Sequence, residues 1–261
     1  KLLSRWPDPQ DAELWRQASY RFHALVARRW RQGRVFLAGD AAHMQPPFLG
    51  QGMCQGIRDV TNLSWKLAAV LQEDVVGTAA QALLDSYGIE RQAHVRELTS
   101  RIKAVGAVIC ERDPAQARQR DARLLAECDG VVKDTPRQDI LPALDQGLLS
   151  SSLSSGRGRL FPQPLLAGKG GELCRMDVLA GNGWRLVLAP KVSPDRASVG
   201  CISPVPLKEG DDPEGVAIDW FRRHECCAAL VRPDNYVYGV ARTEGELIRL
   251  CEEALRALGV G

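Results

Sequence analysis

Acidic, proline and glycine residues gather in the stretch GRVFLAGDAAHMQPPFLGQGMC, residues 33–54. Asp40 closes a short apolar run, and a carboxylate at the end of a strand can accept hydrogen bonds from sugar or polyol hydroxyls. Gly50 and Gly52 let the backbone approach a ligand closely. The helix predicted to follow them begins with free N–H groups and a positive dipole end, which suit a phosphate or negative charge developing on a ring oxygen.

The Pro46-Pro47 pair adds a rigid turn to this stretch. Proline fixes φ and has no N–H, so the two carbonyls can point at a substrate hydroxyl. A ligand with a polyol, a polarised ring and a substrate stacked beside it is a flavin. Each feature alone indicates only a turn or a loop, and His43 in the same stretch is expected to be structural, so the prediction rests on their combination.

The elements that must position these residues follow from hydrophobic periodicity. Residues 35–38 form an apolar run typical of a buried strand. Apolar residues recur with the helical period over residues 53–71, and the polar residues fall largely off that stripe: Gln55, Arg58, Asp59, Asn62 and Lys66. The other elements predicted in this half are a short helix at 11–16, a strand at 19–27, a helix at 78–87 with a continuation over 90–109, and an Arg-rich helix at 116–128.

The second half has a different pattern. Its opening SSSLSSGRGR, residues 150–159, disfavours helix and strand and is typical of a linker or mobile loop. Beyond it the predicted elements are a strand at 184–188, a helix at 215–223, a hairpin of 226–231 with 236–241 turning at RPDN, and a helix at 244–258. This order fits a compact α/β domain from about residue 161 onward.

Composition excludes several classes of protein. The chain has 261 residues, 45% hydrophobic and 25% charged, with a net charge of +2, which is ordinary for a globular protein. Its arginines are scattered, so no nucleic-acid partner is indicated, and no apolar run approaches the roughly 20 residues of a membrane span.

No secretion signal opens the chain, which starts without Met. The eight cysteines form no C-x-x-C pair and no metal-binding spacing, so reduced thiols in the cytoplasm are expected, with Cys226 and Cys227 as structural strand residues.

Residues 33–71, GRVFLAGDAAHMQPPFLGQGMCQGIRDVTNLSWKLAAVL, resemble the second FAD-binding signature of single-component flavin aromatic hydroxylases, the class of para-hydroxybenzoate and phenol hydroxylases. YRFHALVARRW, PPFLGQGMCQGIRD, LLDSYGIERQAHV and LFPQPLL most resemble the 3-(3-hydroxyphenyl)propionate hydroxylase-like branch. The later half resembles, more loosely, the thioredoxin-like C-terminal domain of larger members, which is not a working thioredoxin. The lack of C-x-x-C agrees with this.

The resemblance implies an α/β fold in three parts. Residues 1–113 would be the C-terminal segment of an FAD-binding monooxygenase domain. Residues 114–160 would be a helical connector and Ser/Gly-rich linker, and residues 161–261 a thioredoxin-like domain without redox cysteines.

The resemblance also implies cofactor contacts, at Gly39, Asp40, Gly50, Gly52, Met53 and Cys54. Asp40 would bind the ribityl chain of FAD, and Gly39 would let it sit there. Gly52, Met53 and Cys54 would offer backbone N–H groups to the pyrimidine edge of the isoalloxazine. Many relatives carry Asn in place of Cys54, but a backbone contact survives that change.

On the substrate side, the Pro47 carbonyl is the predicted catalytic group, lying near the substrate hydroxyl beside the reacting face of the flavin. Pro46 and Phe48 would be adjacent to the substrate. The implied reaction is hydroxylation of a phenolic substrate by O₂, with NADH or NADPH as transient reductant. The protein's work would be to position the cofactor, exclude water and stabilise charge.

A complete enzyme of this kind also carries an upstream strand, G-x-G-x-x-G and helix for the ADP half of FAD. The glycines at 168–171 and 181–183 lack that spacing. We therefore expect a C-terminal portion, inactive alone, whose partner is the missing N-terminal portion, with a homodimer as a further expectation. Two alternatives stay open. One is a non-catalytic thioredoxin-like interaction or dimerisation module with a remnant flavin site. The other is a different flavin oxidoreductase reaction on a polyketide-type phenol.

Overall fold

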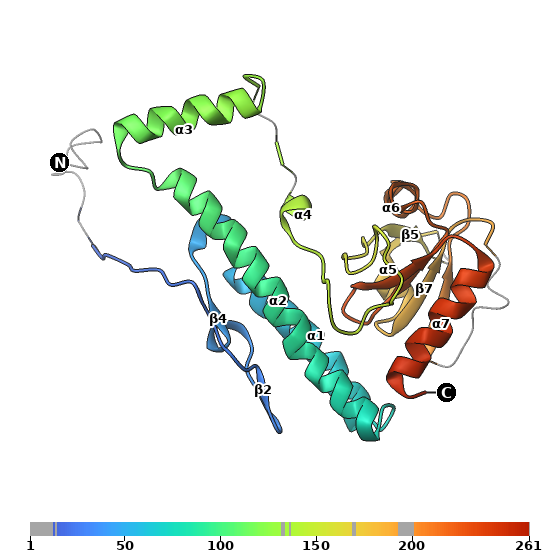
Figure 1. Cartoon of the computed structure of the whole chain (residues 1–261). Helices are drawn as coiled ribbons and strands as arrows, with labels where there is room; N and C mark the ends of the chain where they lie inside the picture. The colour runs from blue at the N-terminus through green and yellow to red at the C-terminus, as the bar shows by residue number, and fades with distance from the viewer. Residues whose placement is uncertain are drawn as a thin grey trace.

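The computed structural model describes residues 13, 15–131, 134–135, 137–168, 171–192 and 201–260. Figure 1 shows a helical N-terminal part beside a C-terminal part built on a mixed sheet. The helix predicted at residues 11–16 lies largely outside the described residues.

The strands of the N-terminal part are very short. β1 (Leu25–Val26) pairs antiparallel with β4 (His43–Met44), and β2 (Arg31–Gln32) pairs antiparallel with β3 (Val35–Phe36). The strands predicted at 19–27 and 35–38 therefore shrink to two residues each, and Val35 is 67% exposed rather than buried. The apolar run at 35–38 was overestimated because each strand here pairs with only one described neighbour, which leaves it with no second layer to bury it.

Two helices pack side by side along the middle of the molecule. α1 (Gly52–Leu71) and α2 (Gly77–Ile109) lie against each other, as Figure 1 shows. α2 confirms the helix predicted at 78–87 and its continuation over 90–109. α3 (Pro114–Glu127) confirms the predicted Arg-rich helix, which the Asp113 carboxylate caps by accepting the N–H groups of Ala115 and Gln116 at 2.9 and 2.8 Å. A short α4 (Arg137–Ile140) follows.

The C-terminal part contains a four-stranded sheet in the order β10-β9-β7-β8. β7 (Trp184–Leu188) and β8 (Ile202–Pro206) are parallel, and β9 (Ala228–Val231) is antiparallel to both β7 and β10 (Val237–Ala241). α6 (Val216–His224) and α7 (Glu244–Leu258) flank the sheet. The remaining elements are β5 (Leu165–Ala167), β6 (Leu173–Arg175) and α5 (Met176–Ala180). The strand, helices and hairpin predicted from the sequence here are confirmed.

The two parts share a hydrophobic core. Alternate residues of β7 point to opposite faces of the sheet, as strand geometry requires. One face packs Leu186 and Leu188 with α7, with Val75 in the turn between α1 and α2, and with Leu83 in α2. The other face packs Val187 with Phe161 and α6. The sheet therefore supports the helical part directly.

The Ser/Gly-rich stretch at 150–159 is not a free linker. The Ser150 N–H donates to the Tyr238 carbonyl at 2.9 Å, and the Gly158 N–H donates to the Val237 carbonyl at 2.9 Å. The Ser150 hydroxyl also donates to the Glu253 carboxylate at 2.7 Å. Composition misled the prediction because serine and glycine disfavour regular structure but still let a loop hydrogen-bond to an exposed strand edge, here β10.

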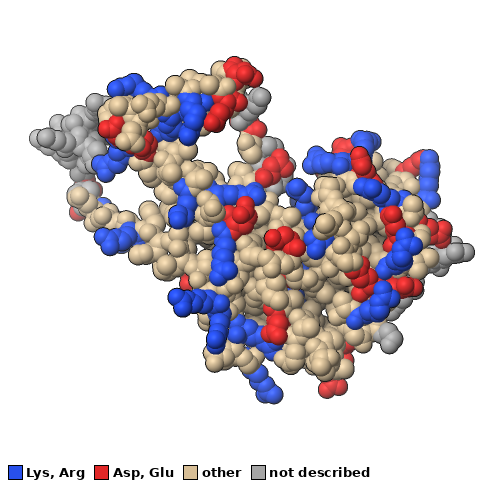
Figure 2. All heavy atoms as spheres, in the orientation of Figure 1, with Lys and Arg blue, Asp and Glu red and all other residues tan. Residues whose placement is uncertain are grey.

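Charged side chains of both signs are distributed over the surface, as in an ordinary globular protein. Figure 2 shows Lys and Arg interspersed with Asp and Glu over the visible face. Within the described ranges, no helix combines the length and apolarity needed to cross a bilayer. No cluster of His, Cys, Asp or Glu suited to a metal ion occurs among those same residues.

Candidate functional site

The Gly39–Ala41 turn (η2) sits directly on α1. Gly39 has φ of +59°, in the left-handed region that favours glycine. It faces Gly56 so closely that a Cβ added at Gly56 would lie 3.4 Å from the Gly39 Cα. These two glycines bring the turn against the second turn of α1.

A buried carboxylate fixes this turn. Asp59 of α1 accepts the Gly39 N–H at 3.0 Å and lies 2.7 Å from the His43 Nε2, both at Oδ2. Its Oδ1 accepts from Arg91 Nε of α2 at 2.9 Å. Arg91 also donates to Gln55 Oε1 at 2.8 Å. The backbone that carries the candidate site is thus tied to both long helices.

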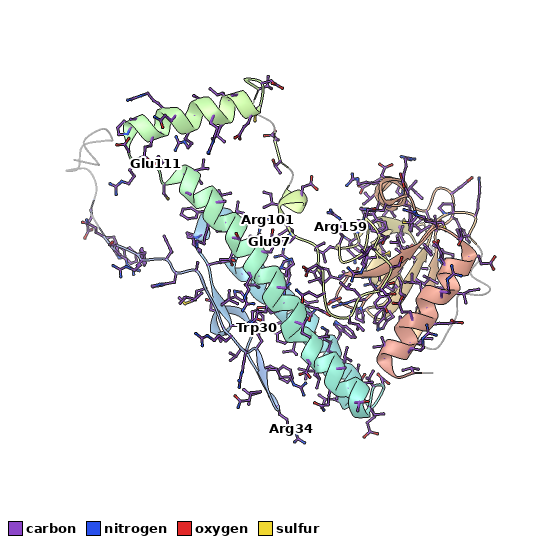
Figure 3. All side chains as sticks on the ribbon, viewed as in Figure 1. Trp30, Arg34, Glu97, Arg101, Glu111 and Arg159 are labelled. Atoms are coloured by element: carbon purple, nitrogen blue, oxygen red, sulfur yellow. The ribbon has the colours of Figure 1, made fainter. Side chains whose placement is uncertain are left out.

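Aromatic packing closes the turn from the other side. The His43 ring stacks on Trp30, with centroids 5.5 Å apart, and Trp30 meets Tyr87 of α2 edge-on at 5.7 Å. Figure 3 shows Trp30 beside α2. The Tyr87 hydroxyl donates to the Leu37 carbonyl at 2.6 Å. His43 is therefore an interior residue whose hydrogen bond goes to Asp59.

Asp40 has the opposite environment. Its side chain is exposed, and no hydrogen bond or ion pair from the described part of the chain reaches its carboxylate. The first intrahelical donor of α1 is the Gln55 N–H, which donates to the Gln51 carbonyl, so the N–H groups of Gly52, Met53 and Cys54 precede the helical ladder. An exposed carboxylate and a helix N-terminus at the same end of α1 fit a ligand with hydroxyls and an electron-rich edge.

The Pro-Pro turn is rigid, and one of its carbonyls is already engaged. Pro46 is extended, and Pro47 opens the 3₁₀ turn η3 (Pro47–Leu49), which ends at Gly50 with φ of 59°. The Gly50 N–H donates to the Pro47 carbonyl at 2.9 Å. A carbonyl oxygen has two lone pairs, so one remains for a second donor.

Phe48 turns toward α2. A Cβ added at Gly106 would lie 2.3 Å from Phe48 Cε2, so the ring occupies the space that the glycine leaves. Phe48 and Gly50 also line a cavity of about 370 Å³, together with Ile140 and Leu141 of the connector. The predicted substrate-adjacent residue therefore both anchors η3 on α2 and borders an open space.

All the predicted site residues lie around the N-terminal end of α1. η2 reaches that helix through Gly39, and η3 reaches α2 through Phe48. What the sequence reasoning missed is the polar network beneath them.

The missed signal lies in the spacing of α1. Gln55, Asp59, Asn62 and Lys66 recur every three or four residues, and all four are fully buried. The apolar stripe faces outward instead, with Met53, Ile57 and Val60 exposed at 77%, 56% and 57%. A polar stripe with helical spacing, opposite Glu90 and Arg91 of α2, could have predicted this packing.

A second buried cluster joins α1 and α2 to the C-terminal hairpin. The Glu90 carboxylate accepts from Lys66 Nζ at 2.8 Å, from Arg232 Nη2 at 2.7 Å and from Asn62 at 2.7 Å. Arg232 also pairs with Asp234 at 2.6 Å. Burial alone would raise the pKa of Glu90, but Arg232 and Lys66 outweigh it and lower that pKa to about 2.

The sequence of this chain is similar to those of known proteins. Residues 5–102 match the family model described as an FAD binding domain. The chain is 40% identical, over 96% of its length, to a probable NADH-specific resorcinol 4-hydroxylase from Rhodococcus jostii strain RHA1. It is 32% identical, over 89% of its length, to a 3-(3-hydroxy-phenyl)propionate/3-hydroxycinnamic acid hydroxylase from Mycobacterium sp. strain JLS.

Two solved structures extend the comparison. The OxyS anhydrotetracycline hydroxylase from Streptomyces rimosus is 27% identical, with a TM-score of 0.65 over 90% of this chain and 46% of that one. A ternary complex of aklavinone-11 hydroxylase with FAD and aklavinone is also 27% identical, with a TM-score of 0.64 over 90% of this chain and 45% of that one.

The matches confirm the resemblance predicted from the sequence. The chain is similar over most of its own length to curated aromatic hydroxylases, and its residues 5–102 match an FAD binding domain. It spans about half the length of the curated relatives that it matches, 48% and 46% of the two named above.

Proposed function

We propose that the chain is part of an FAD-dependent monooxygenase that hydroxylates a phenolic ring, using O₂ and a nicotinamide reductant. The observation that carries this proposal is the exposed Asp40 carboxylate beside the free N–H groups of α1, held by the buried Asp59 network. The 40% identity to a probable NADH-specific resorcinol 4-hydroxylase supports NADH as the reductant and a small dihydroxybenzene as the substrate class. Because NADH is supplied inside the cell, we place the protein in the cytoplasm.

In this proposal, one set of residues contacts the cofactor and another contacts the substrate. Asp40 accepts hydrogen bonds from the ribityl hydroxyls, and the N–H groups of Gly52, Met53 and Cys54 stabilise negative charge on the pyrimidine edge. Gly50 lets the chain bend sharply between η3 and α1. When bound, FAD supplies the transfer of one oxygen atom from O₂ to the ring, a chemistry that no side chain of the protein can provide.

The Pro-Pro turn holds the substrate in this proposal. The second lone pair of the Pro47 carbonyl accepts a hydrogen bond from the phenolic hydroxyl, while the Gly50 N–H fixes the direction of that carbonyl. Pro46 stiffens the approach to the turn. Phe48 borders the space beside it and excludes water.

A further portion of polypeptide completes the flavin site. The outward apolar stripe of α1 is the kind of exposed surface that marks an interface. No G-x-G-x-x-G occurs in the 261 residues, so we infer that the portion covering this stripe holds the ADP half of FAD. A homodimer of the completed protein stays a prediction, which sedimentation analysis of the intact protein tests.

We also propose that the C-terminal part is a thioredoxin-like domain without redox function. The order β10-β9-β7-β8, with β7 and β8 parallel and the other pairs antiparallel, is that of the thioredoxin sheet, and α7 follows the final hairpin as it does there. Burial raises the pKa values of Cys226 and Cys227, so both thiols stay protonated.

Two other functions are weighed against this one. Similarity to an anhydrotetracycline hydroxylase and to an aklavinone-11 hydroxylase favours a polyketide-type phenol as the alternative substrate. The higher identity to a resorcinol hydroxylase favours the smaller ring. A non-catalytic interaction module is the third reading, and it predicts no flavin binding at all.

The test uses the intact protein. We expect it to bind FAD and to consume NADH and O₂ in the presence of resorcinol, with hydroxylated product formed for each NADH consumed. Activity on a tetracyclic phenol but not on resorcinol would shift the assignment to the polyketide class. Failure of the intact protein to bind FAD would contradict the enzyme and leave the non-catalytic module.

A further inference from the structure

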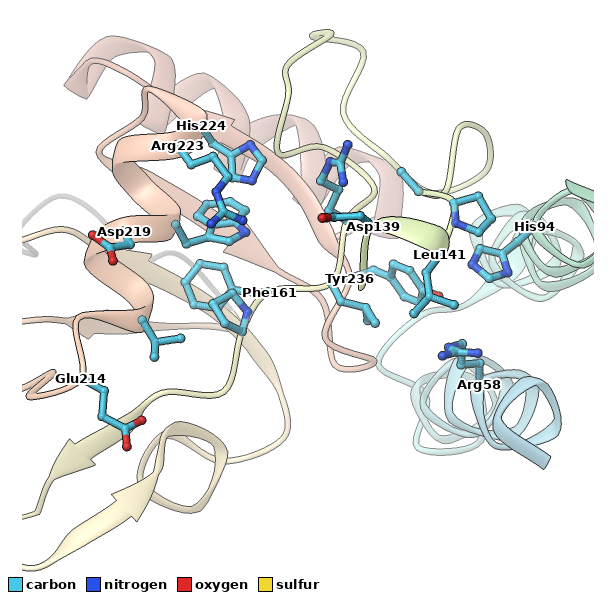
Figure 4. A pocket seen from close by; sticks show the side chains of 17 residues that line it. Arg58, His94, Asp139, Leu141, Phe161, Glu214, Asp219, Arg223, His224 and Tyr236 are labelled. Carbon is cyan, nitrogen blue, oxygen red and sulfur yellow. The ribbon is translucent and has the colours of Figure 1, made fainter. Parts of the chain in front are cut away.

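A cavity of about 490 Å³ separates the two long helices from the C-terminal part. One side is formed by Arg58 of α1 and His94 of α2, and the other by Phe161 and α6, with the connector at Leu141 between them (Figure 4). Its volume is within the range of small-molecule sites. None of the residues predicted to contact flavin or phenol lines it.

The end of this cavity beside Arg58 and His94, called the inner end below, holds buried polar atoms without partners. Tyr236 and His94 are each 3% exposed, yet within the described chain the Tyr236 hydroxyl and the His94 Nδ1 have no hydrogen-bond partner. Buried polar groups in folded proteins are nearly always paired, so two unpaired ones on neighbouring rings need an explanation. Their rings lie 6.4 Å apart, edge to face. Figure 4 shows both beside Arg58 and Leu141.

This end of the cavity is also positively charged. The Arg58 guanidinium donates one N–H to Gln51 Oε1 at 3.1 Å, and Arg91 lies behind it with an unpaired Nη1. Burial, followed by the charges of Arg91 and Arg58, lowers the pKa of His94 to about 2, so that ring is neutral. Burial raises the pKa of Tyr236, so its hydroxyl keeps its proton and can donate it.

The remainder of the cavity is aromatic, with acidic groups toward its far end. Phe161 and Trp220 form a wall, with their ring centroids 4.7 Å apart. Glu214 and Asp219 lie at the end away from Arg58, as Figure 4 shows, and Asp219 is paired with Arg222. Asp139 of the connector also lines the space. A ligand that satisfies this distribution carries its negative charge inward and presents a ring to the aromatic wall.

We propose that this cavity binds a small aromatic carboxylate, with the carboxylate held by Arg58 and the Tyr236 hydroxyl and the ring directed toward Phe161 and Trp220. A carboxylate matches two convergent donors. Arg159 also lines the cavity, where its Nε donates to the Ser155 carbonyl at 3.1 Å, and no lysine is among the lining residues. None of the residues predicted to contact flavin lines this site, although Arg58 donates to Gln51, which lies between Gly50 and Gly52. The proposal does not rest on the proposed function.

The test is titration of the intact protein with benzoate, followed by calorimetry. We expect one saturable site per chain. Benzamide, which keeps the ring but not the charge, and acetate, which keeps the charge but not the ring, should each bind at least about tenfold more weakly. Equal binding of benzoate and benzamide would overturn the proposal.

Variants locate the site within the cavity. Arg58→Gln should weaken benzoate binding at least about tenfold, and Tyr236→Phe about three- to tenfold, because the latter removes only the unpaired hydroxyl and keeps the ring. Arg223→Gln at the far end is the matched control and should leave binding unchanged. Circular dichroism establishes that each variant is folded. Unchanged binding in both Arg58→Gln and Tyr236→Phe, or loss only in Arg223→Gln, would place benzoate elsewhere.

One more variant separates this proposal from the flavin site. Benzoate should bind Asp40→Ala, prepared without FAD, as tightly as it binds the parent protein. Loss of benzoate binding in that variant would assign benzoate to the flavin site and overturn the proposal. Failure of the intact protein to bind FAD would contradict the proposed enzyme but leave benzoate binding intact.

Discussion

Two aspartates nineteen residues apart on the chain, Asp40 and Asp59, have opposite environments. Asp59 is fully buried and takes part in three short polar contacts, with Gly39, His43 and Arg91. Asp40 is exposed and meets no described donor. A buried carboxylate whose lone pairs are already engaged can only hold structure, whereas an exposed carboxylate with open lone pairs can bind a ligand. Burial alone therefore separates the carboxylate that holds the structure, Asp59, from the one that is open to a ligand, Asp40.

Removing the exposed carboxylate should weaken FAD binding without weakening the fold. In the intact protein, Asp40→Ala loses one charge-assisted acceptor, which is worth about 1.5–3 kcal/mol, or roughly 10- to 150-fold in the FAD dissociation constant. Flavin fluorescence titration measures this constant, and urea unfolding of the FAD-free protein should give the parent midpoint. An unchanged dissociation constant would remove Asp40 from the flavin site.

Removing the buried charge of Asp59, in contrast, should weaken the fold. Asp59→Asn leaves the Arg91 guanidinium buried without a counter-charge, and breaking a buried pair in this way costs about 3–5 kcal/mol. We expect the free energy of unfolding to fall by about that amount, with weaker FAD binding as the Gly39 turn loosens. Asp85→Asn is the control, because its ion pair with Arg31 has the Asp85 side chain 63% exposed and is worth about 0–1 kcal/mol. Equal losses from both variants would contradict the positioning role of Asp59.

At the scale of the elements, the sequence predicts what local periodicity determines. The long helix at 53–71, the 226–241 hairpin and the final helix carry their own patterns and turn residues, and all are confirmed. The strands at 19–27 and 35–38 were overestimated because strand length depends on partners that no local pattern reveals.

The same limit applied to the candidate site. The contiguous motif at 39–54 supplies the predicted site residues. The network beneath them pairs α1 with α2 across 20 to 40 residues, so it appears only when Asp59 and Asn62 are placed on one helical face opposite Glu90 and Arg91. An apolar stripe usually marks the buried face of a helix, and here that rule selects the exposed one.

The packing of η3 on α2 depends on one glycine. Gly106→Ala would drive a methyl group into the Phe48 ring and displace the Pro-Pro turn, at an overpacking cost of about 1–3 kcal/mol. The gain of about 1 kcal/mol in helix propensity offsets this only in part. We expect a lower unfolding midpoint, together with a larger share of NADH consumption that ends in hydrogen peroxide.

A matched glycine makes this prediction specific. Gly245→Ala in α7 meets nothing closer than the Arg249 guanidinium at 3.6 Å, so it should stabilise the protein by about 0.4–1 kcal/mol. Product formed per NADH consumed should stay at the parent value in that variant. If Gly106→Ala behaved like Gly245→Ala in both measurements, Phe48 would not hold the turn in place.

At the scale of the whole molecule, Glu90 joins the two parts of the chain. Its carboxylate binds Lys66 and Asn62 on α1 and Arg232 on the hairpin turn, which lies 142 residues away in sequence. All these side chains are fully buried. The C-terminal part is therefore attached to α1 and α2 by a charged cluster as well as by the shared core. A domain without redox cysteines can serve the site in this way, by holding α1 and α2 in register.

Acid should release this attachment in a defined range of pH. The pKa of Glu90 is lowered from 4.5 to about 2, so the unfolded chain binds the proton more readily than the folded one. The stability that Glu90 contributes is therefore fully present above about pH 4.5 and is lost as the pH falls through about 2.

Glu90→Gln should lower the free energy of unfolding by about 3–5 kcal/mol at pH 7, because Arg232 and Lys66 lose a buried partner. The difference between parent and variant should shrink between pH 4.5 and 2. Urea unfolding followed by tryptophan fluorescence measures it, since Arg232 lies 5.6 Å from the Trp65 ring. Glu97→Gln is the control, as its pair with Arg101 is half-exposed (Figure 3) and should contribute about 0–1 kcal/mol at any pH. A Glu90→Gln deficit that persisted undiminished at pH 2 would show that the loss comes from packing and not from the charge of Glu90.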